Sequence, residues 1–288
     1  MPQWNCACTN CRAARAGEIP ARTQSSVALS ADGERWFLVN ASPDLRVQIE
    51  SFAPLQPRPG SVRASPIEAV LLTNADLDHV LGLVLLREGG ALPVHATSAV
   101  RSTLVADLRL EGLLGAFGGI RWLDAAFEQT PLLDRSGSPS GISYRTILLP
   151  GGPPPYAKRT DDAPGHSAAF QFTDENKGGR LLVAPDLAGL TPEFSAALAD
   201  SEAVLIDGTF WSDEELRAVR PAARTALEMG HLPVAEGTLG LMQAASARYK
   251  AYVHLNNTNP ILMPGAPERA AVEAAGVCVA EDGWEFEL

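Results

Sequence analysis

The segment from Leu71 to Leu83 constrains the fold of this chain more than any other. It reads Leu-Leu-Thr-Asn-Ala-Asp-Leu-Asp-His-Val-Leu-Gly-Leu. The apolar run at 67–73 predicts a buried β-strand, and the pattern at 80–88 predicts an amphipathic helix. In α/β proteins, polar side chains at the C-terminal end of a strand line the crevice where ligands bind. The segment therefore predicts an α/β unit and makes Asp78 and His79 candidates for a binding site at the end of the strand.

Asp78 and His79 admit two interpretations. A carboxylate beside an imidazole is a pair of donors that suits a divalent transition metal. Asp is also a favoured N-cap residue, so Asp78 can instead cap a helix that begins at His79. Taken alone, the pair favours capping, because a cap needs only one residue. The choice depends on polar residues elsewhere in the chain.

Length and composition narrow the class of protein. A chain of 288 residues can hold one large core or two modest domains, and we expect a single domain over 1–288. The formal charge of −11, without any basic block, argues against binding to a phosphate backbone. No apolar run approaches the roughly 20 residues that span a bilayer, and a secretory signal is absent. We expect a cytoplasmic protein with no nucleic-acid or membrane partner.

Three of the four cysteines form the motif Cys6-x-Cys8-x-x-Cys11, and Cys278 lies near the other end of the chain. Nothing indicates export, so a disulfide framework is not expected. Thiolates converging from a tight turn suit a tetrahedral metal, which favours a structural zinc over unrelated buried thiols. The fourth ligand must come from elsewhere: Cys278, or a side chain in the 254–257 segment.

The rest of the chain predicts two sheets. Segments 23–30 and 35–40 flank Asp32-Gly33 and predict a hairpin, and Ser42 with Pro43 predicts the start of a helix. Further strands are expected at 92–95, 142–149, 168–172, 180–184, 203–206 and 250–255, and helices at 191–199, 233–247 and 267–275. Strands that begin antiparallel and later alternate with helices predict a four-layer αββα fold.

Four more polar residues stand at the ends of predicted strands: His166, Asp186, Asp207 and His254. One such residue is weak evidence, because polar groups there often satisfy loop amides. Four of them, added to Asp78 and His79, need a common reason to be buried. The pattern predicts a shared metal site and reverses the preference for capping.

His231 precedes a predicted helix in Met-Gly-His-Leu-Pro. It is either an acid/base residue beside the metal or a histidine without chemistry, and the two interpretations are about even. We expect Asp207 and His231 to line the same site, with His231 transferring the proton. Gly208 and Thr209 permit close backbone approach there. For His95, which ends a short strand, we expect a structural role.

Several motifs, spread over nearly the whole chain, carry a family resemblance. They are Pro2-Gln-Trp-Asn-Cys-x-Cys-x-x-Cys11, Ala21-Arg-Thr-Gln-Ser-Ser26, Asn40-Ala-Ser-Pro-Asp44, Asp78-His-x-x-Gly82-Leu, Asp207-Gly-Thr-x-Trp211, Met229-Gly-His-Leu232 and His254-x-Asn-Asn-Thr-Asn-Pro-Ile261. With them the chain resembles the metallo-β-lactamase superfamily and, within it, a family of proteins of pyrroloquinoline quinone biosynthesis. The resemblance implies the αββα fold, a cysteine-bound structural zinc and a metal site in the crevice between the sheets.

The metal site departs from the superfamily loop His-x-His-x-Asp-His. Asn74 and Asp76 stand where the two leading histidines would be, so one metal position keeps only His166. The resemblance implies that the other position is intact, held by Asp78, His79 and His254, with Asp186 as a possible bridge. Two histidines and a carboxylate with open positions form the ligand set of non-haem iron oxygenases. We therefore expect one divalent metal in the crevice, Fe(II).

The resemblance implies an oxygenase that hydroxylates the tyrosine ring of a Glu-Tyr precursor. Asp76, Asp207 and His231 are the candidate catalytic residues, and other proteins of quinone biosynthesis are expected partners. Two alternatives stay open: a soluble carrier that moves the quinone or its precursor toward the periplasm, and a hydrolase that uses paired zinc ions. The resemblance also implies a β-strand ahead of Pro2, which we expect to be missing.

Overall fold

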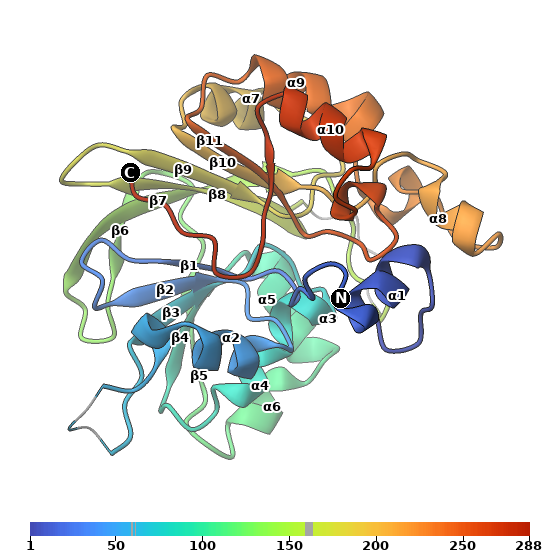
Figure 1. The fold of residues 1–288 in the computed structure, drawn as a ribbon. Coiled ribbons are helices and arrows are strands. Elements are labelled where there is room, and N and C mark those ends of the chain that lie inside the picture. Colours follow the sequence, from blue (N-terminus) through green and yellow to red (C-terminus); the bar gives the residue numbers. More distant parts are fainter. Residues whose placement is uncertain (59, 61, 159–163) are drawn as a thin grey trace. The chain divides into compact units, whose positions relative to one another are not determined.

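The computed structural model describes residues 1–58, 60, 62–158 and 164–288, which form two compact units. Unit 1 comprises Met1–Gln24 and Leu181–Glu287, and unit 2 comprises Ser25–Arg180 with Leu288 (Figure 1). The expectation of a single domain over 1–288 stays a prediction. Within the described residues, no helix is long and apolar enough to cross a membrane.

Unit 2 contains a five-stranded sheet in the order β1-β2-β3-β4-β5. Its strands are β1 (Val27–Leu29), β2 (Trp36–Val39), β3 (Ile67–Leu71), β4 (Leu92–Ala96) and β5 (Ile120–Asp124). The antiparallel pair β1–β2 confirms the predicted hairpin. Its turn is held by Asp32, whose Oδ1 accepts the N–H groups of Glu34 and Arg35. The remaining strands pair in parallel.

Short helices pack against this sheet: α2 (Leu45–Ser51), α3 (Leu77–Val80), α4 (Gly82–Leu85), α5 (Ser98–Ala106) and α6 (Leu110–Leu114), with the 3-10 turn Ala53–Leu55. Their apolar side chains form one core with the strands, around fully buried residues such as Val70, Leu83 and Leu104. Such side chains contribute roughly 1.5–3 kcal/mol each on burial. This core fixes the end of β3, where the candidate ligands begin.

Two predicted helix starts were wrong. The helix expected at Ser42 begins at Leu45, because the Ser42 hydroxyl accepts the N–H of Asp44 in a turn ahead of it. The single helix expected at 80–88 is split into α3, which begins at Leu77, and α4, which ends at Leu85, so Asp78 lies inside the first turn of α3 rather than at its cap. The capping interpretation of Asp78 is therefore wrong. Asp76 occupies the N-cap position and makes no side-chain cap bond.

Unit 2 also contains the antiparallel strands β6 (Thr130–Leu133), β7 (Pro139–Leu149) and β8 (Ser167–Asp174). Tyr144 on β7 reaches β4, where its hydroxyl lies 2.8 Å from Nδ1 of His95. Burial and the nearby Arg121 charge lower the pKa of His95 to about 4, so this imidazole is neutral. These contacts fit the structural role expected of His95.

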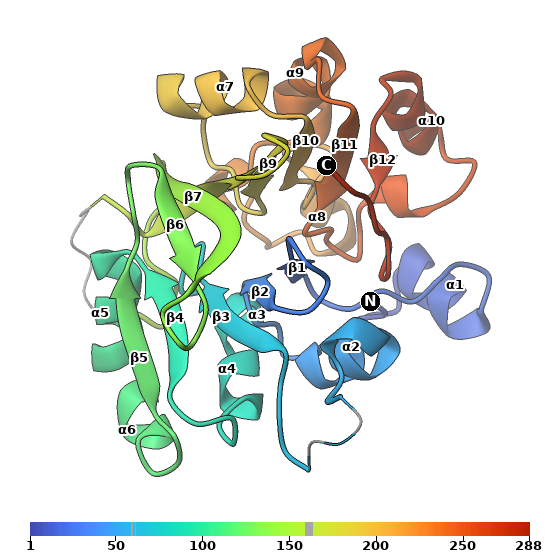
Figure 2. The same cartoon turned by 90° about the vertical axis from the view of Figure 1, so that its left-hand side faces the viewer.

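Unit 1 is built on the parallel strands β9 (Arg180–Ala184), β10 (Ala203–Asp207), β11 (Tyr249–Val253) and β12 (Cys278–Val279). Figure 2 shows α7 (Pro192–Ala199), α9 (Leu239–Ala244) and α10 (Pro267–Ala274) along one side of these strands. The unit also contains α1 (Thr9–Ala16), α8 (Glu215–Val219), the 3-10 turns Leu227–Met229 and Pro260–Leu262 and the π-helical turn Val234–Thr238. The carboxyl ends of parallel strands share one edge, and that edge carries Asp186, Asp207 and His254.

The two sheets with flanking helices confirm the predicted mixed α/β class. The predicted strand 180–184 is confirmed at both ends. The strand expected at 250–255 ends instead at Val253, because His254 adopts a left-handed backbone with φ 55°. The helix expected at 233–247 is split into the π-helical turn and α9. The strands β5, β6 and β12 and the helices α1, α5, α6 and α8 were not predicted.

Candidate metal centre and cysteine cluster

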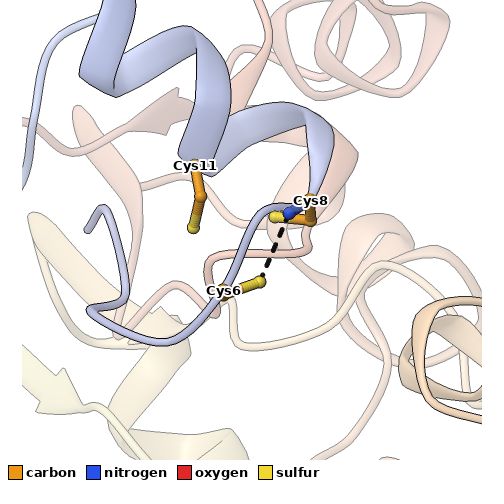
Figure 3. A group of neighbouring side chains, drawn as sticks. All are labelled: Cys6, Cys8 and Cys11. Carbon is orange, nitrogen blue, oxygen red and sulfur yellow. Dashed lines mark hydrogen bonds between the residues drawn. The ribbon is translucent and has the colours of Figure 1, made fainter.

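The three cysteines of the N-terminal motif meet in unit 1 (Figure 3). The Sγ atoms of Cys6, Cys8 and Cys11 all lie within 4.8 Å of one another. Cys8 is the N-cap of α1, and its N–H donates to Cys6 Sγ at 3.4 Å. Cys11 is fully buried inside the helix. The tight turn and the following helix thus turn three thiols toward one point, as a tetrahedral structural metal requires.

The environment of the cluster favours a thiolate at Cys8. Burial opposes ionisation, but hydrogen bonds from the Cys11 backbone and the Asn257 side chain lower the pKa of the Cys8 thiol. Burial raises the pKa of Cys11. Metal binding requires deprotonated cysteines. The residues therefore fit a zinc ion in chemistry and in spacing.

Asn257 supplies the polar contact expected from the 254–257 segment. Its Nδ2 lies 3.3 Å from Cys6 Sγ and 3.5 Å from Cys8 Sγ. Its backbone oxygen accepts from Cys8 Sγ at 3.4 Å. Cys278 lies exposed on β12 and, among the described residues, is not part of the cysteine group. The structure thus favours the 254–257 segment over Cys278 as the source of a fourth ligand.

In unit 2, Asn74 holds the ring of His79. Oδ1 of Asn74 accepts the N–H of Asp76 at 3.0 Å, which defines the orientation of the amide. The same oxygen lies 2.8 Å from Nδ1 of His79. Because an amide oxygen can only accept, His79 carries its proton on Nδ1 and leaves Nε2 unprotonated. An unprotonated ring nitrogen is the form that binds metals.

The backbone around His79 is also fixed. The N–H of Ala41 donates to the His79 oxygen at 2.7 Å, and the N–H of Gly82 donates to the Ala41 oxygen at 2.8 Å. A Cβ at position 82 would lie 2.3 Å from the Ser42 oxygen, so only glycine fits. The segments 40–44 and 78–82 are therefore held together by backbone hydrogen bonds and by close packing at Gly82.

His166 is a buried imidazole directly before the start of β8. Within the described part of the chain, neither of its ring nitrogens has a hydrogen-bond partner. The next residues fix its place, since the N–H of Ala168 donates to the Thr73 oxygen at 2.8 Å, directly before Asn74. A buried polar group without a partner points to a ligand such as a metal ion. His166 therefore fits the metal-ligand prediction.

In unit 1, the structure brings Asp186, His231 and His254 together. One ligand atom from each lies within 4.8 Å of the others. Oδ1 of Asp186 is 3.7 Å from Nδ1 of both histidines. The two imidazoles stack, with ring centroids 5.6 Å apart. This set can itself hold a divalent metal, with His231 as a ligand.

Asp207 lies beneath this set and is fully buried. Its Oδ2 is 2.7 Å from Nδ1 of His231. Burial opposes the charged form, but His231, His254 and Thr209 lower the pKa of Asp207. In turn, although burial disfavours the imidazolium, the Asp207 carboxylate raises the pKa of His231. Gly208 is required beside it, since a Cβ there would lie 2.7 Å from Tyr252 Cβ.

The predicted ligands belong to both units: Asp78, His79 and His166 to unit 2, and Asp186 and His254 to unit 1. A metal shared by Asp78, His79 and His254 stays a prediction, as do the catalytic roles of Asp76, Asp207 and His231. The sequence pointed to the 254–257 segment without singling out Asn257, and it did not reveal the part played by Asn74. It treated Thr209 only as a residue that permits close approach, whereas its hydroxyl contacts Asp207 and His254.

Comparison with known proteins defines the class first. A model of the β-lactamase superfamily domain matches residues 35–255. A new diphosphatase from the PhnP family shares the fold, with a TM-score of 0.66, 14% sequence identity and coverage of 100% of this chain and 92% of that chain. These two matches agree with the parallel strands and polar strand ends described above.

Closer relatives define the family. Coenzyme PQQ synthesis protein B of Pseudomonas putida (strain GB-1) is 39% identical over 100% of this chain and 96% of its own length. The protein of the same name from Rhizobium meliloti (strain 1021) is 39% identical, covering 100% and 94%. The crystal structure of zinc-bound PqqB from Methylobacterium extorquens matches with a TM-score of 0.88 and 34% identity over 100% and 95%. The chain belongs to the family of coenzyme PQQ synthesis protein B, within the β-lactamase superfamily.

Proposed function

We propose that the protein acts in the synthesis of coenzyme PQQ, pyrroloquinoline quinone, as a metal-dependent oxygenase. The pathway is supported by the name shared by its full-length relatives. A metal is supported by the zinc-bound relative and by the clustered donors. The substrate we propose is the tyrosine ring of a Glu-Tyr precursor, and other proteins of the same pathway are the partners we propose.

One observation carries the choice of reaction. Oδ1 of Asn74 accepts from His79, so position 74 supports a ligand instead of being one. A hydrolase with two zinc ions needs an imidazole at this position of the loop to hold its second metal. We therefore propose one divalent metal, Fe(II), held by Asp78, His79 and His254, with Asp186 and His166 as further donors. Two imidazoles and a carboxylate leave positions open for other ligands.

Bound ferrous iron supplies the activation of oxygen. Each hydroxylation replaces a ring C–H bond with C–OH, using one atom of O₂. The second oxygen atom becomes water with two electrons and two protons, and an external reductant of the ascorbate class supplies the electrons. The ring carbon must release a proton when aromaticity returns.

The chain's own residues provide for that proton. Nδ1 of His231 is held by Asp207, which leaves Nε2 of His231 to accept the proton. The buried Asp207 carboxylate then stabilises the imidazolium, in agreement with the raised pKa of His231. Asp76 remains a candidate catalytic carboxylate at the start of α3.

The test is anaerobic reconstitution with Fe(II), addition of Glu-Tyr dipeptide and ascorbate, exposure to ¹⁸O₂ and mass spectrometry. We expect a gain of one or two labelled oxygen atoms, and about one equivalent of metal per chain outside the cysteine cluster. His254→Ala should abolish the gain and this metal while the cysteine cluster keeps its zinc as an internal control. Tight binding without a mass change would favour a carrier of the quinone or its precursor. Two stoichiometric metals outside the cysteine cluster, or full activity in His254→Ala, would favour a different assignment.

A further inference from the structure

A hydrogen-bond donor faces each lone-pair site of the Asp207 carboxylate. Oδ1 accepts the N–H of Thr209 at 2.9 Å and the Thr209 hydroxyl at 2.6 Å. Oδ2 accepts the N–H of Leu187 at 3.0 Å and lies 2.7 Å from Nδ1 of His231. An ionised carboxylate only accepts hydrogen bonds and offers about four lone-pair sites. All four sites of Asp207 are therefore matched to a donor.

This arrangement determines the direction of each bond. His231 must donate from Nδ1, because the Asp207 oxygens already face two backbone N–H groups and a hydroxyl, the donors that an ionised carboxylate accepts. The hydroxyl of Thr209 must donate to Oδ1, because two oxygen lone pairs facing each other at 2.6 Å inside the protein would repel.

The hydroxyl proton of Thr209 is therefore used in the bond to Asp207 and cannot be donated to His254. Nδ1 of His254 lies 2.8 Å from the same hydroxyl oxygen, so His254 must be the donor in that bond. The backbone oxygen of His254 is also 2.8 Å away. One hydroxyl proton cannot serve both acceptors, and the charged carboxylate is the nearer and stronger of the two.

We infer that Asp207 sets the tautomer of two imidazoles, His231 directly and His254 through the hydroxyl of Thr209. In the neutral state both rings then carry a proton on Nδ1 and present an unprotonated Nε2. Thr209 is thus a positioning residue: it touches no substrate but fixes which nitrogen of His254 can bind. Groups that orient a metal ligand in this way typically change metal affinity 10- to 100-fold when removed.

The backbone of His254 supports the same conclusion. Its left-handed φ of 55° is unfavourable for a residue with a side chain. The strain persists because surrounding contacts hold the residue, among them the 2.8 Å bond between Nδ1 of His254 and the Thr209 hydroxyl oxygen. The N–H of Gly208 also donates to the Val253 oxygen at 2.9 Å, which ties the two strand ends together.

The importance of this inference rests on the proposed function, in which His254 binds metal and His231 moves a proton. The tautomers themselves do not depend on the proposed function, because they can be measured without substrate and without a metal at His254. We propose two-bond ¹H–¹⁵N correlation spectra of the ¹⁵N-histidine-labelled protein, with zinc kept in the cysteine cluster and no metal added at His254, at about pH 9, where imidazoles are neutral. His231 and His254 should both show the pattern of an Nδ1 proton.

Two variants of near-equal size test the bond between Thr209 and His254 separately from the bond between Asp207 and His231. Thr209→Val should shift His254 toward the Nε2-protonated form while His231 keeps its Nδ1 proton, which also reports that the site is folded. Thr209→Ser should restore the wild-type pattern at His254. Zinc affinity at the site that includes His254 should fall about 10- to 100-fold in Thr209→Val and recover in Thr209→Ser.

An Nε2 proton on His254 in the wild type, or an unchanged His254 pattern in Thr209→Val, would overturn the inference. If Thr209→Val does not fold, the wild-type and Thr209→Ser spectra still decide it. The expected tautomers in a protein that oxidises no tyrosine would leave this inference standing and remove the proposed oxygenase. Oxidation of tyrosine by a protein in which His231 or His254 carries its proton on Nε2 would support the proposed oxygenase and overturn this inference.

Discussion

Oδ1 of Asn74 lies 2.8 Å from Nδ1 of His79, at the position where the superfamily loop carries its first histidine. Asn74, which stands where the superfamily loop has a metal ligand, thus holds the ring of His79. The Asp76 N–H, which donates to the same oxygen at 3.0 Å, prevents the amide from turning. Asn74 is therefore a positioning residue for the ring of His79.

Asn74→Ala should weaken metal binding at His79, because the ring loses the acceptor that selects its Nδ1 proton. We expect a loss of about 10- to 100-fold in zinc affinity, measured by competition with a chelating indicator. Asn74→Asp, which keeps an acceptor oxygen, is the matched control and should stay close to the wild type. Equal affinity in all three proteins would show that Asn74 does not position the ligand.

Cys8→Ser should lower stability and zinc content together, because the cluster loses one of its three thiolates. Structural zinc contributes directly to folding free energy, so the midpoint of thermal unfolding should fall. Any folded fraction should keep the metal at the histidine site. Cys278→Ser, which changes an exposed cysteine on β12, should leave zinc and stability unchanged. Full zinc and normal melting in Cys8→Ser would contradict a structural metal.

His231→Ala should leave the bound metal in place and reduce turnover by about 10²- to 10⁴-fold, the usual effect of losing an acid/base group. The measurement is metal content beside the rate of tyrosine hydroxylation. Because Asp186, His231 and His254 also form a possible ligand set, loss of the metal would identify His231 as a ligand instead.

Glu215 should make stability depend on pH near neutrality. Burial raises the pKa of its carboxyl to about 7, although the Thr258 hydroxyl at 2.6 Å and the Trp211 N–H at 2.6 Å favour the charged form. The unfolded chain loses this proton near the ordinary value of 4.5, whereas the folded chain holds it until about pH 7. The free energy of unfolding should therefore fall as pH rises from 4.5 to 7 and change no further above it.

The size of this effect is roughly 1–3 kcal/mol, from 1.36 kcal/mol per pKa unit reduced for partial solvent screening. Urea unfolding at a series of pH values measures it. In Glu215→Gln the same pH interval should lose this component, since an amide does not titrate. A pH profile identical in Glu215→Gln and the wild type would exclude Glu215 as its source.

Local patterns predicted the elements that depend on neighbours in sequence. The apolar run at 180–184 became β9 with the expected ends, and the Asp32-Gly33 turn joined β1 to β2. The same patterns misplaced the helix start at Ser42, and taken alone they favoured a cap at Asp78 that the structure does not show. A cap is decided by which backbone groups lie nearby after packing, so local spacing alone cannot separate a cap from a nearby turn.

The sequence by itself determined the fold class, the cysteine motif and the set of polar residues at the strand ends, because these follow from hydrophobic periodicity and residue chemistry. The tertiary structure alone decided which partner each polar atom has. Asn257 meets Cys8 across 249 positions of the chain, and Thr209 meets His254 across 45. Hydrogen bonds of this kind act over about 3 Å between atoms that only the packed strands bring together. Periodicity in the sequence carries no record of those distances, so the side chains that hold the ligands were visible only in the folded protein.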